Sequence, residues 1–320
     1  MEDEEKMKIL MITPRWDKVI GGGEISVRLL VNELRDNGHH VDVLYGLNMI
    51  KMYYEVKKRV DDYDVFHSYN MGYMPVLGII TKKYNINSVA TLNGIVYSNS
   101  MGNGNFLKKL RNNFFYKYIN NIKKFVTLCE FHKKCWKKDG LTNIKIINNM
   151  IDKNFKVIPN KQADKYRVVM IGRESWYRDF GSFKTIANMY KDKFDFFTIG
   201  QKINGIKNIE FGSYDGMPEL YSQFDILYHP QKVPILCHRV FLESMINGIL
   251  VITTGNDLYS NIIQNNKSGI LTENLRRDIN IFKYLSEVQI VKLGLEGRKR
   301  VLDVCEPEKI VKQYIKVYEL

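Results

Sequence analysis

Two arginines in the second half of the chain have the spacing and the chemistry of a diphosphate-binding site. Arg173 and Arg178 flank a loop that begins at Gly172 and follows the apolar run 167–172, which is typical of a buried strand. Two guanidinium groups on one loop at the carboxyl end of a strand can hold a diphosphate bidentately. Isolated arginines are more often surface charges, and it is the position at a strand end that favours binding.

A glycine loop in the first half suits the same kind of ligand. Gly21, Gly22 and Gly23 lie between an apolar strand and an amphipathic helix at 24–36. Residues without Cβ let the backbone approach a phosphate, and a helix N-terminus adds N–H donors and a favourable dipole. A dinucleotide-binding fingerprint has a third glycine where this chain has Ser26, which argues against an oxidoreductase. A tight turn that binds no ligand remains the alternative.

Both loops belong to an alternation of strand and helix signals. Strands are expected at 8–12, 41–45, 64–67, 88–92, 124–128 and 144–147, and again at 167–172, 194–199, 226–229 and 249–253. This rhythm predicts βαβ units with parallel sheets, and a length of 320 residues fits two domains. We therefore predict an α/β protein of two Rossmann-like domains, 1–155 and 156–306, that face each other across a cleft. The apolar stretch 307–320 is expected to form a helix that packs back on the first domain.

The composition is that of a globular protein inside the cell. No apolar run reaches the roughly 18 residues of a membrane span, and the first residues are acidic, unlike a secretory signal. The four cysteines and six histidines show no metal-ligand spacing. We expect a cytoplasmic protein without a metal or a cofactor.

The net charge of +13 is concentrated in one region, where residues 65–138 contain twelve Lys or Arg and one acid. Aromatic residues are interleaved with these charges, and such a face suits an anionic surface at the inner side of a membrane. The residues expected there are Lys108, Lys109, Arg111, Lys117, Lys123 and Lys124. A solvated basic face is the alternative, and no nucleic-acid-binding module is legible.

The segment 225–248 resembles the donor-binding region of the retaining GT-B glycosyltransferases of the glycosyltransferase family 4 type. LESMING at 242–248 is similar to the "lEama.G" helix of that family. Further similarities follow in the family's order along nearly the whole chain: the glycine loop with GHHV at 38–41 ("GG.E … GH.V"), DVFH at 64–67 ("DvvH"), NMID at 149–152 ("NGiD") and GR at 172–173, with Arg178 in place of the lysine of "KG".

This resemblance implies roles for individual residues. Glu243 is expected to accept hydrogen bonds from the ribose hydroxyls of a nucleotide-sugar donor, while Arg173 and Arg178 hold the diphosphate and stabilise it as a leaving group without a metal. The other residues expected at the donor are Gly21, Gly22, Gly23, Gly172, His238 and Arg239. Asn93 and His67 are expected near the acceptor and the reacting sugar.

Four positions depart from the family's pattern, and all fall near the expected chemistry; one is the glycine at the start of the donor-site helix, which His238 replaces. Ile235 stands where the family has the first glutamate of a pair, which contacts the donor sugar. Asn93 stands where histidine is frequent, and an amide cannot act as an acid or base at neutral pH. Asp179 replaces the glycine of "KG". These changes bear on activity rather than on fold.

The sequence thus predicts a metal-independent, retaining glycosyltransferase that moves a hexose from a nucleotide diphosphate sugar to a lipid-linked or glycan acceptor. It leaves open the base and the sugar of the donor. The alternative is a non-catalytic protein of the same fold that binds a sugar nucleotide or a glycan. A nucleic-acid-binding protein that uses the lysine-rich half is a third, less favoured hypothesis.

Overall fold

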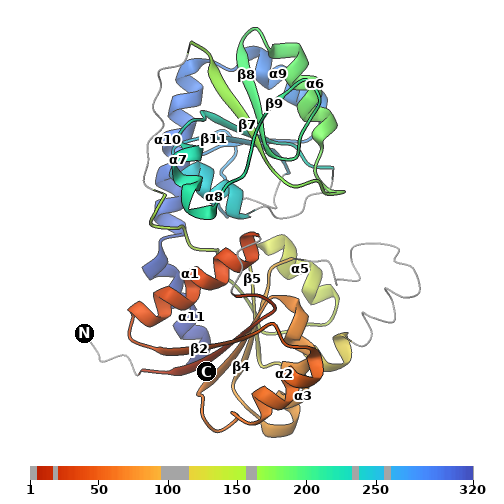
Figure 1. The fold of residues 1–320 in the computed structure, drawn as a ribbon, viewed down its shortest axis with the longest axis vertical. Coiled ribbons are helices and arrows are strands. Elements are labelled where there is room, and N and C mark those ends of the chain that lie inside the picture. Colours follow the sequence, from red (N-terminus) through yellow and green to blue (C-terminus); the bar gives the residue numbers. More distant parts are fainter. Residues whose placement is uncertain are drawn as a thin grey trace. The chain divides into compact units, whose positions relative to one another are not determined.

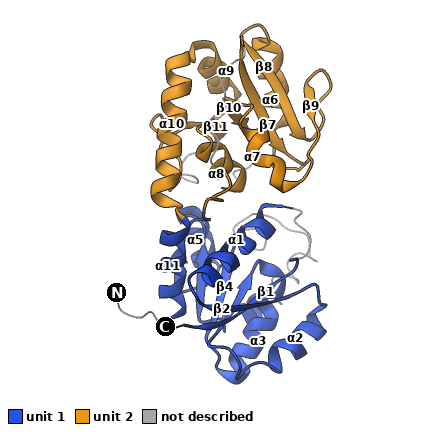
Figure 2. Cartoon of the chain, turned by 60° about the vertical axis from the view of Figure 1, so that its left-hand side comes forward, with its two compact units in different colours: residues 1–150, 307–320 blue, residues 151–306 orange. Residues whose placement is uncertain are grey.

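The computed structural model of the protein describes residues 6–16, 21–94, 115–155, 164–232, 238–255 and 261–319. The chain forms two compact units (Figure 1, Figure 2). Unit 1 comprises Met1–Met150 and Pro307–Leu320, and unit 2 comprises Ile151–Glu306. The last helix thus belongs to the same unit as the first half of the chain, and the two units divide a few residues before the domain boundary predicted after residue 155.

Unit 1 is built on a parallel sheet of six strands in the order β2-β1-β3-β4-β5-β6. The strands are β1 (Lys8–Thr13), β2 (His40–Tyr45), β3 (Val65–Tyr69), β4 (Ser88–Leu92), β5 (Lys124–Thr127) and β6 (Ile144–Ile146). The helices are α1 (Gly22–Asp36), α2 (Met49–Lys57), α3 (Met74–Tyr84), α5 (Glu130–Lys138) and α11 (Pro307–Tyr318), with the short 3-10 helix η1 (Met71–Tyr73).

Helices cover both faces of this sheet. Helices α1 and α11 pack on one face through residues such as Leu30 and Tyr314, and α2, α3 and α5 pack on the other through Met52, Leu77 and Trp136. Strands enclosed on both sides are mostly apolar, which explains the continuous apolar run of β1. Polar side chains that follow a strand therefore gather at the carboxyl edge of the sheet.

Unit 2 repeats this architecture with the strand order β12-β11-β10-β7-β8-β9. Its strands are β7 (Tyr166–Gly172), β8 (Phe194–Gly200), β9 (Lys207–Ile209), β10 (Ile226–His229), β11 (Leu250–Thr254) and β12 (Ile270–Thr272). Its helices are α6 (Phe180–Tyr190), α7 (Met217–Tyr221), α8 (His238–Ile246), α9 (Leu275–Tyr284) and α10 (Glu287–Val304), with the 3-10 helix η3 (Tyr214–Gly216).

In each unit the chain begins near the middle of the sheet, builds outward to one edge, and then returns to build the other side. The strand order therefore reverses between β1 and β3 in unit 1, and between β7 and β10 in unit 2. At such a reversal the loops beyond the carboxyl ends of the two central strands diverge, which leaves room for a ligand. Each unit thus has one preferred place for a binding site.

The predicted fold class, two Rossmann-like domains with parallel sheets, is confirmed. All ten strands expected from the sequence are present. Strands β9 and β12 were missed; each has three residues and lies at an edge of its sheet. A three-residue run is too short to show the periodicity on which strand prediction depends.

Helix α10 lies close to α8 and β11 because residue 294 has no side chain. A Cβ at Gly294 would lie 2.1 Å from the backbone carbonyl oxygen of Gly248. We expect Gly294→Ala to destabilise the protein by about 1–3 kcal/mol in urea unfolding, although alanine favours a helix over glycine by about 1 kcal/mol. Gly212→Ala is the control, because nothing lies within 4 Å of its added Cβ. Equal unfolding midpoints for the two variants would contradict this packing.

Candidate functional site

The loops after β7 and β10 are joined at the reversal point of unit 2. The backbone N–H of Asp179 donates to the carbonyl oxygen of Pro230 at 3.0 Å, and the N–H of Lys232 donates to that of Tyr177 at 2.8 Å. Asp179 also caps helix α6, since its Oδ1 accepts the backbone N–H of Ser182 at 3.0 Å. The loop that carries the two predicted arginines is thereby fixed at the carboxyl edge of the sheet.

Arg178 packs its guanidinium group on the backbone of Gly172. The φ of Gly172 is +144°, which L residues rarely adopt, and a Cβ there would lie 2.5 Å from Cζ of Arg178. Nη1 of Arg178 donates to the carbonyl oxygen of Arg173 and, at 3.2 Å, to Oγ of Ser175. The side chain of Arg173 is exposed. One loop therefore carries one cation fixed against the backbone and a second that is open to solvent.

His229, the last residue of β10, was not predicted as a site residue, yet it lies beside Arg178. It is fully buried, and its ring meets that of Phe241 edge-on with centroids 5.6 Å apart. Burial, assisted by the charge of Arg178, lowers the pKa of His229 to about 3. The imidazole is therefore neutral and adds no charge at this edge. Its place at the end of an apolar strand, directly before a proline, was the available sequence signal.

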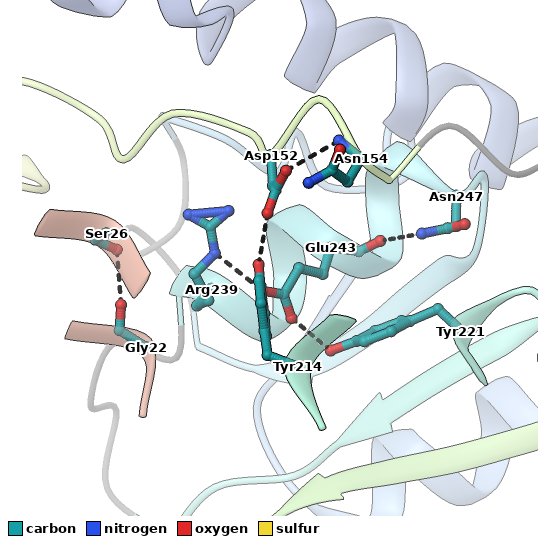
Figure 3. A network of polar contacts seen from close by, with 9 residues as sticks. All are labelled: Gly22, Ser26, Asp152, Asn154, Tyr214, Tyr221, Arg239, Glu243 and Asn247. Carbon is teal, nitrogen blue, oxygen red and sulfur yellow. Dashed lines mark hydrogen bonds and ion pairs between the residues drawn. The ribbon is translucent and has the colours of Figure 1, made fainter. Parts of the chain in front are cut away.

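Glu243 on α8 is the centre of a buried polar network (Figure 3). Nε of Arg239, one turn earlier on the same helix, donates to Oε1 at 3.0 Å, and the hydroxyl of Tyr221 donates to Oε2 at 2.9 Å. The hydroxyl of Tyr214 lies 3.1 Å from Oε1. Both charged side chains are buried, with 4% of Glu243 and 6% of Arg239 exposed. The two predicted residues are thus adjacent, and they pair with each other.

The hydroxyl of Tyr214 lies between two carboxylates, because it is also 3.1 Å from Oδ2 of the buried Asp152. A phenol carries a single hydrogen and can donate to only one of them at a time. When the hydroxyl of Tyr214 donates to one of the two carboxylates, its contact with the other is favourable if that other carboxyl group carries a proton and donates to the phenol oxygen. Burial raises the pKa of Glu243, although the charge of Arg239 opposes this change. The network is therefore suited to hold one additional proton.

These contacts limit what Glu243 can offer to a ligand. A carboxylate has about four acceptor positions, and the three protein groups described above use most of them. Two vicinal ribose hydroxyls fit only if one protein donor withdraws. Tyr214 is the candidate, since it is half-buried on the short helix η3, whereas Tyr221 is fully buried. Neither tyrosine was predicted, because isolated tyrosines outside a motif give no signal.

The carboxyl edge of unit 1 brings the glycine loop close to Asn93. Gly21 is the N-cap of α1, and Gly22 and Gly23 form its first turn without a side-chain cap. A Cβ at Gly23 would lie 3.3 Å from Oδ1 of Asn70, the residue that follows β3. The same oxygen accepts a hydrogen bond from Nδ2 of Asn93 at 2.6 Å. Asn70 was not predicted, and it connects the two features that were.

His67 does not lie at this edge. It is the middle residue of β3 and fully buried; Nδ1 is 2.8 Å from the hydroxyl of Tyr318, and Nε2 is 2.8 Å from Oγ1 of Thr91. Burial lowers the pKa of His67 to about 3. The expectation that His67 lies near the acceptor is therefore corrected: both ring nitrogens are used within the core, Nδ1 toward Tyr318 of α11 and Nε2 toward Thr91 of β4.

The basic residues predicted to face a membrane separate into different environments. Lys117 and Lys123 are exposed. Lys124 is buried, and its Nζ donates to the carbonyl oxygen of Val317 in α11 at 2.6 Å, so its assignment to a surface is corrected. Three of the six lie outside the described residues: Lys108, Lys109 and Arg111.

His238 is the first residue of α8, and its side chain, like Ile235, lies outside the described part of the chain. Among the described residues, no group of three or more His, Cys, Asp or Glu side chains is arranged to hold a metal ion. Within the same ranges, no helix combines the length and the apolar character needed to cross a membrane.

No family model and no curated protein matches this sequence. Solved structures match it over nearly the whole chain. The Anabaena protein Alr3699/HepE in complex with UDP-glucose superposes with a TM-score of 0.78 and 14% identity, covering 98% of this chain and 99% of its own. Sucrose-phosphate synthase from Thermosynechococcus elongatus gives a TM-score of 0.79 at 14% identity, covering 98% of both chains. A glycosyltransferase from Rickettsia africae gives 0.71 at 17% identity, covering 98% of both chains.

The chain has the GT-B fold. The resemblance to GT-B glycosyltransferases that the sequence motifs predicted is thereby confirmed at the level of the fold. In this GT-B chain the two reversal points carry the residues expected from the motifs: the glycine loop and Asn93 in unit 1, and Gly172, Arg173 and Arg178 in unit 2.

The buried histidines of this GT-B chain make its stability sensitive to acid. The folded-state pKa values of His67 and His229 are about 3, whereas an unfolded histidine has a pKa near 6.5. The unfolded chain therefore binds protons that the folded chain does not. Stability is complete above pH ~6.5 and falls below it by about 1.4 kcal/mol per pH unit for each histidine. Urea unfolding between about pH 7 and pH 5 measures this slope.

His67→Gln should reduce the dependence of the unfolding free energy on pH between about pH 7 and pH 5, whether or not it changes the urea concentration at the unfolding midpoint. A slope that is unchanged in His67→Gln would contradict the neutral, buried state of this ring.

Removal of Glu243 should destabilise the protein independently of any ligand. Glu243→Ala removes the carboxylate that is paired with the buried Arg239, and we expect a loss of about 3–5 kcal/mol in urea unfolding. Glu296→Ala, which removes an exposed acid on α10, should change stability by less than about 0.5 kcal/mol. If both variants unfold at the same urea concentration, the ion pair does not have the importance assigned to it.

Proposed function

We propose that this protein is a metal-independent, retaining glycosyltransferase that moves a hexose from a nucleotide diphosphate sugar to a lipid-linked or glycan acceptor. The observation that carries the proposal is the pair of arginines on one anchored loop at the strand-order reversal of unit 2. The fold supports it, because the Anabaena protein of the same fold was solved in complex with UDP-glucose and with UDP.

The arginine loop suits a diphosphate that leaves with its electrons. Negative charge grows on the phosphate oxygens as the bond to the sugar breaks, and cations fixed in advance stabilise that charge without reorganisation. Arg178 is held by Gly172 and Ser175, while Arg173 is free to meet the ligand. The neutral His229 behind them adds no competing charge. This arrangement supports departure of the diphosphate without a metal.

The nucleoside end of the donor is assigned to the region of Glu243. Its carboxylate would accept ribose hydroxyls after Tyr214 releases Oε1. Tyr221 and Arg239 would keep the carboxylate in place during that exchange, since both bonds are buried. In this role Glu243 binds and orients the donor and takes no part in proton transfer.

The acceptor end of the reaction is assigned to unit 1. Asn93 lies there with the glycine loop, and its amide can orient a hydroxyl but cannot remove its proton. The leaving phosphate of the donor is therefore the proposed base, in line with the family resemblance.

A non-catalytic protein that binds a nucleotide sugar is the second candidate. Ile235 stands where a sugar-binding glutamate is expected, and Asn93 stands where a histidine is frequent. Such a protein would bind the donor without transferring or hydrolysing the sugar, so a turnover measurement separates the two candidates.

The first experiment is calorimetric titration with UDP, GDP, ADP and dTDP. We expect one nucleotide to bind, and Arg173→Ala to weaken it by about 10- to 100-fold, the loss of a charge-assisted hydrogen bond. Arg276→Ala, an exposed arginine on α9, is the matched control and should bind normally. NMR of the product formed from the corresponding nucleotide sugar should show the same anomeric configuration as the donor. The rate of transfer should be unchanged by EDTA.

Failure to bind any of the four nucleotides would overturn the transferase proposal. Binding of a nucleotide sugar without transfer or hydrolysis would favour the second candidate instead. Equal weakening by Arg173→Ala and Arg276→Ala would show that the arginine loop is not the diphosphate site.

A further inference from the structure

Asn70 has a backbone conformation that is almost confined to glycine. Its φ is 75° and its ψ is 150°, a region that L residues adopt only when their surroundings impose it. Three other described residues that are not glycine have a positive φ, namely Asn85, Asn143 and Asn266, with values between 49° and 58°. Those values fall in the left-handed region that asparagine tolerates. Asn70 is thus the strained member of this group.

The strained residue lies at the reversal point of the unit 1 sheet. Asn70 follows β3 directly, and β3 is one of the two strands between which the order reverses. A glycine would adopt the same backbone without strain, so what the side chain contributes is a contact. That contact is the hydrogen bond of 2.6 Å from Nδ2 of Asn93 to Oδ1 of Asn70.

This hydrogen bond fixes the direction of the Asn93 amide. The backbone beside Asn93 is also held, because Nε1 of Trp136 donates to the carbonyl oxygen of Gly94 at 3.1 Å. With Nδ2 engaged by Asn70, the opposite end of the amide is the carbonyl oxygen Oδ1. That oxygen is shielded from solvent and has no hydrogen-bond partner among the described residues. A shielded acceptor oxygen without a partner has its hydrogen bond satisfied only when a ligand brings an N–H or O–H donor to it.

We propose that Asn70 is a positioning residue for the transfer reaction: it holds the amide of Asn93 so that Oδ1 accepts a hydrogen bond from a sugar hydroxyl. The proposal rests on the proposed function, and it adds the device by which unit 1 orients a sugar without an acid or base. The backbone strain at Asn70 is the cost of presenting an acceptor where a glycine would present none.

The test compares Asn70→Gly with Asn85→Gly. Both replace an asparagine of positive φ with glycine, and Asn85 lies at the end of α3 rather than at the site. Asn70→Gly should keep or raise the thermal midpoint while kcat/KM for transfer falls about five- to tenfold, the loss of one neutral hydrogen bond. Asn85→Gly should leave kcat/KM unchanged. If Asn70 had a purely structural role, Asn70→Gly would lower the thermal midpoint and kcat/KM together.

A double-mutant cycle tests whether Asn70 acts through Asn93. Asn93→Ala should lower kcat/KM by itself, and adding Asn70→Gly should cause no further loss, because the group that Asn70 positions is already absent. Additive losses would overturn the proposal, as would wild-type turnover of Asn70→Gly. The affinity for the nucleotide that binds the wild-type protein in the calorimetric titration should be equal in all variants, since the arginine loop is untouched. A wild-type protein without turnover would remove the proposed function together with this inference, whereas full turnover of Asn70→Gly removes this inference alone.

Discussion

Covering both faces of two parallel sheets with helices is the constraint on which the arrangement of this protein depends. Strands that are buried on both sides carry mostly apolar side chains, and the few polar ones are bonded within the core, so groups available to a ligand lie on the loops beyond the carboxyl ends. Among those loops, the ones at a reversal of strand order diverge and leave space. Gly172, Arg173 and Arg178 lie at the reversal between β7 and β10, and Asn70 lies at that between β1 and β3. The strand order thus determines which loops have room to bind a ligand.

Both reversal points depend on a residue with an unusual backbone, although the side chains differ. Gly172 has a positive φ and no Cβ, which lets the guanidinium group of Arg178 rest on the backbone. Asn70 also has a positive φ but keeps a side chain, which reaches Asn93. At Gly172 the absence of a Cβ lets the guanidinium group of Arg178 lie against the backbone. At Asn70 a strained backbone is combined with a side chain that holds the amide of Asn93. Each fixes a polar group before any ligand binds.

Prediction from sequence succeeded where one local signal was sufficient. Runs of four to six mostly apolar residues identified ten strands. Arg173 and Arg178 were singled out as site residues because they lie on the loop that follows such a run, and that assignment stays a prediction. His67 was misassigned because a motif gives the identity of a residue and not the face toward which it points. The helix that buries it arrives 251 residues later, with Tyr318. Asn70 escaped prediction because its distinction is a backbone angle.

The network around Glu243 was beyond prediction for another reason: Asp152, Tyr214, Tyr221 and Glu243 come from separate segments that only the folded chain assembles. A buried ion pair such as Arg239 with Glu243 adds little net stability compared with an apolar replacement, so its value lies in geometry. The two tyrosine hydroxyls connect Glu243 of α8 to η3 and α7, and Tyr214 extends the connection to Asp152 at the start of unit 2.

The charge balance of this network bears on the ligand that it can accept. Asp152, Glu243 and Arg239 lie together in a buried place and bring two carboxyl groups against one guanidinium group. A phosphate there would bring its negative charge close to the oxygens of both carboxyl groups, which disfavours it. Two hydroxyls bring donors without charge, so they can replace the hydroxyl of Tyr214 at Oε1 and leave the electrostatics unchanged. The network therefore favours a neutral diol, and in the proposed function the anionic part of the nucleotide sugar binds to Arg173 and Arg178. This division of one ligand between two chemically distinct places supports a nucleotide diphosphate sugar over a simple phosphate.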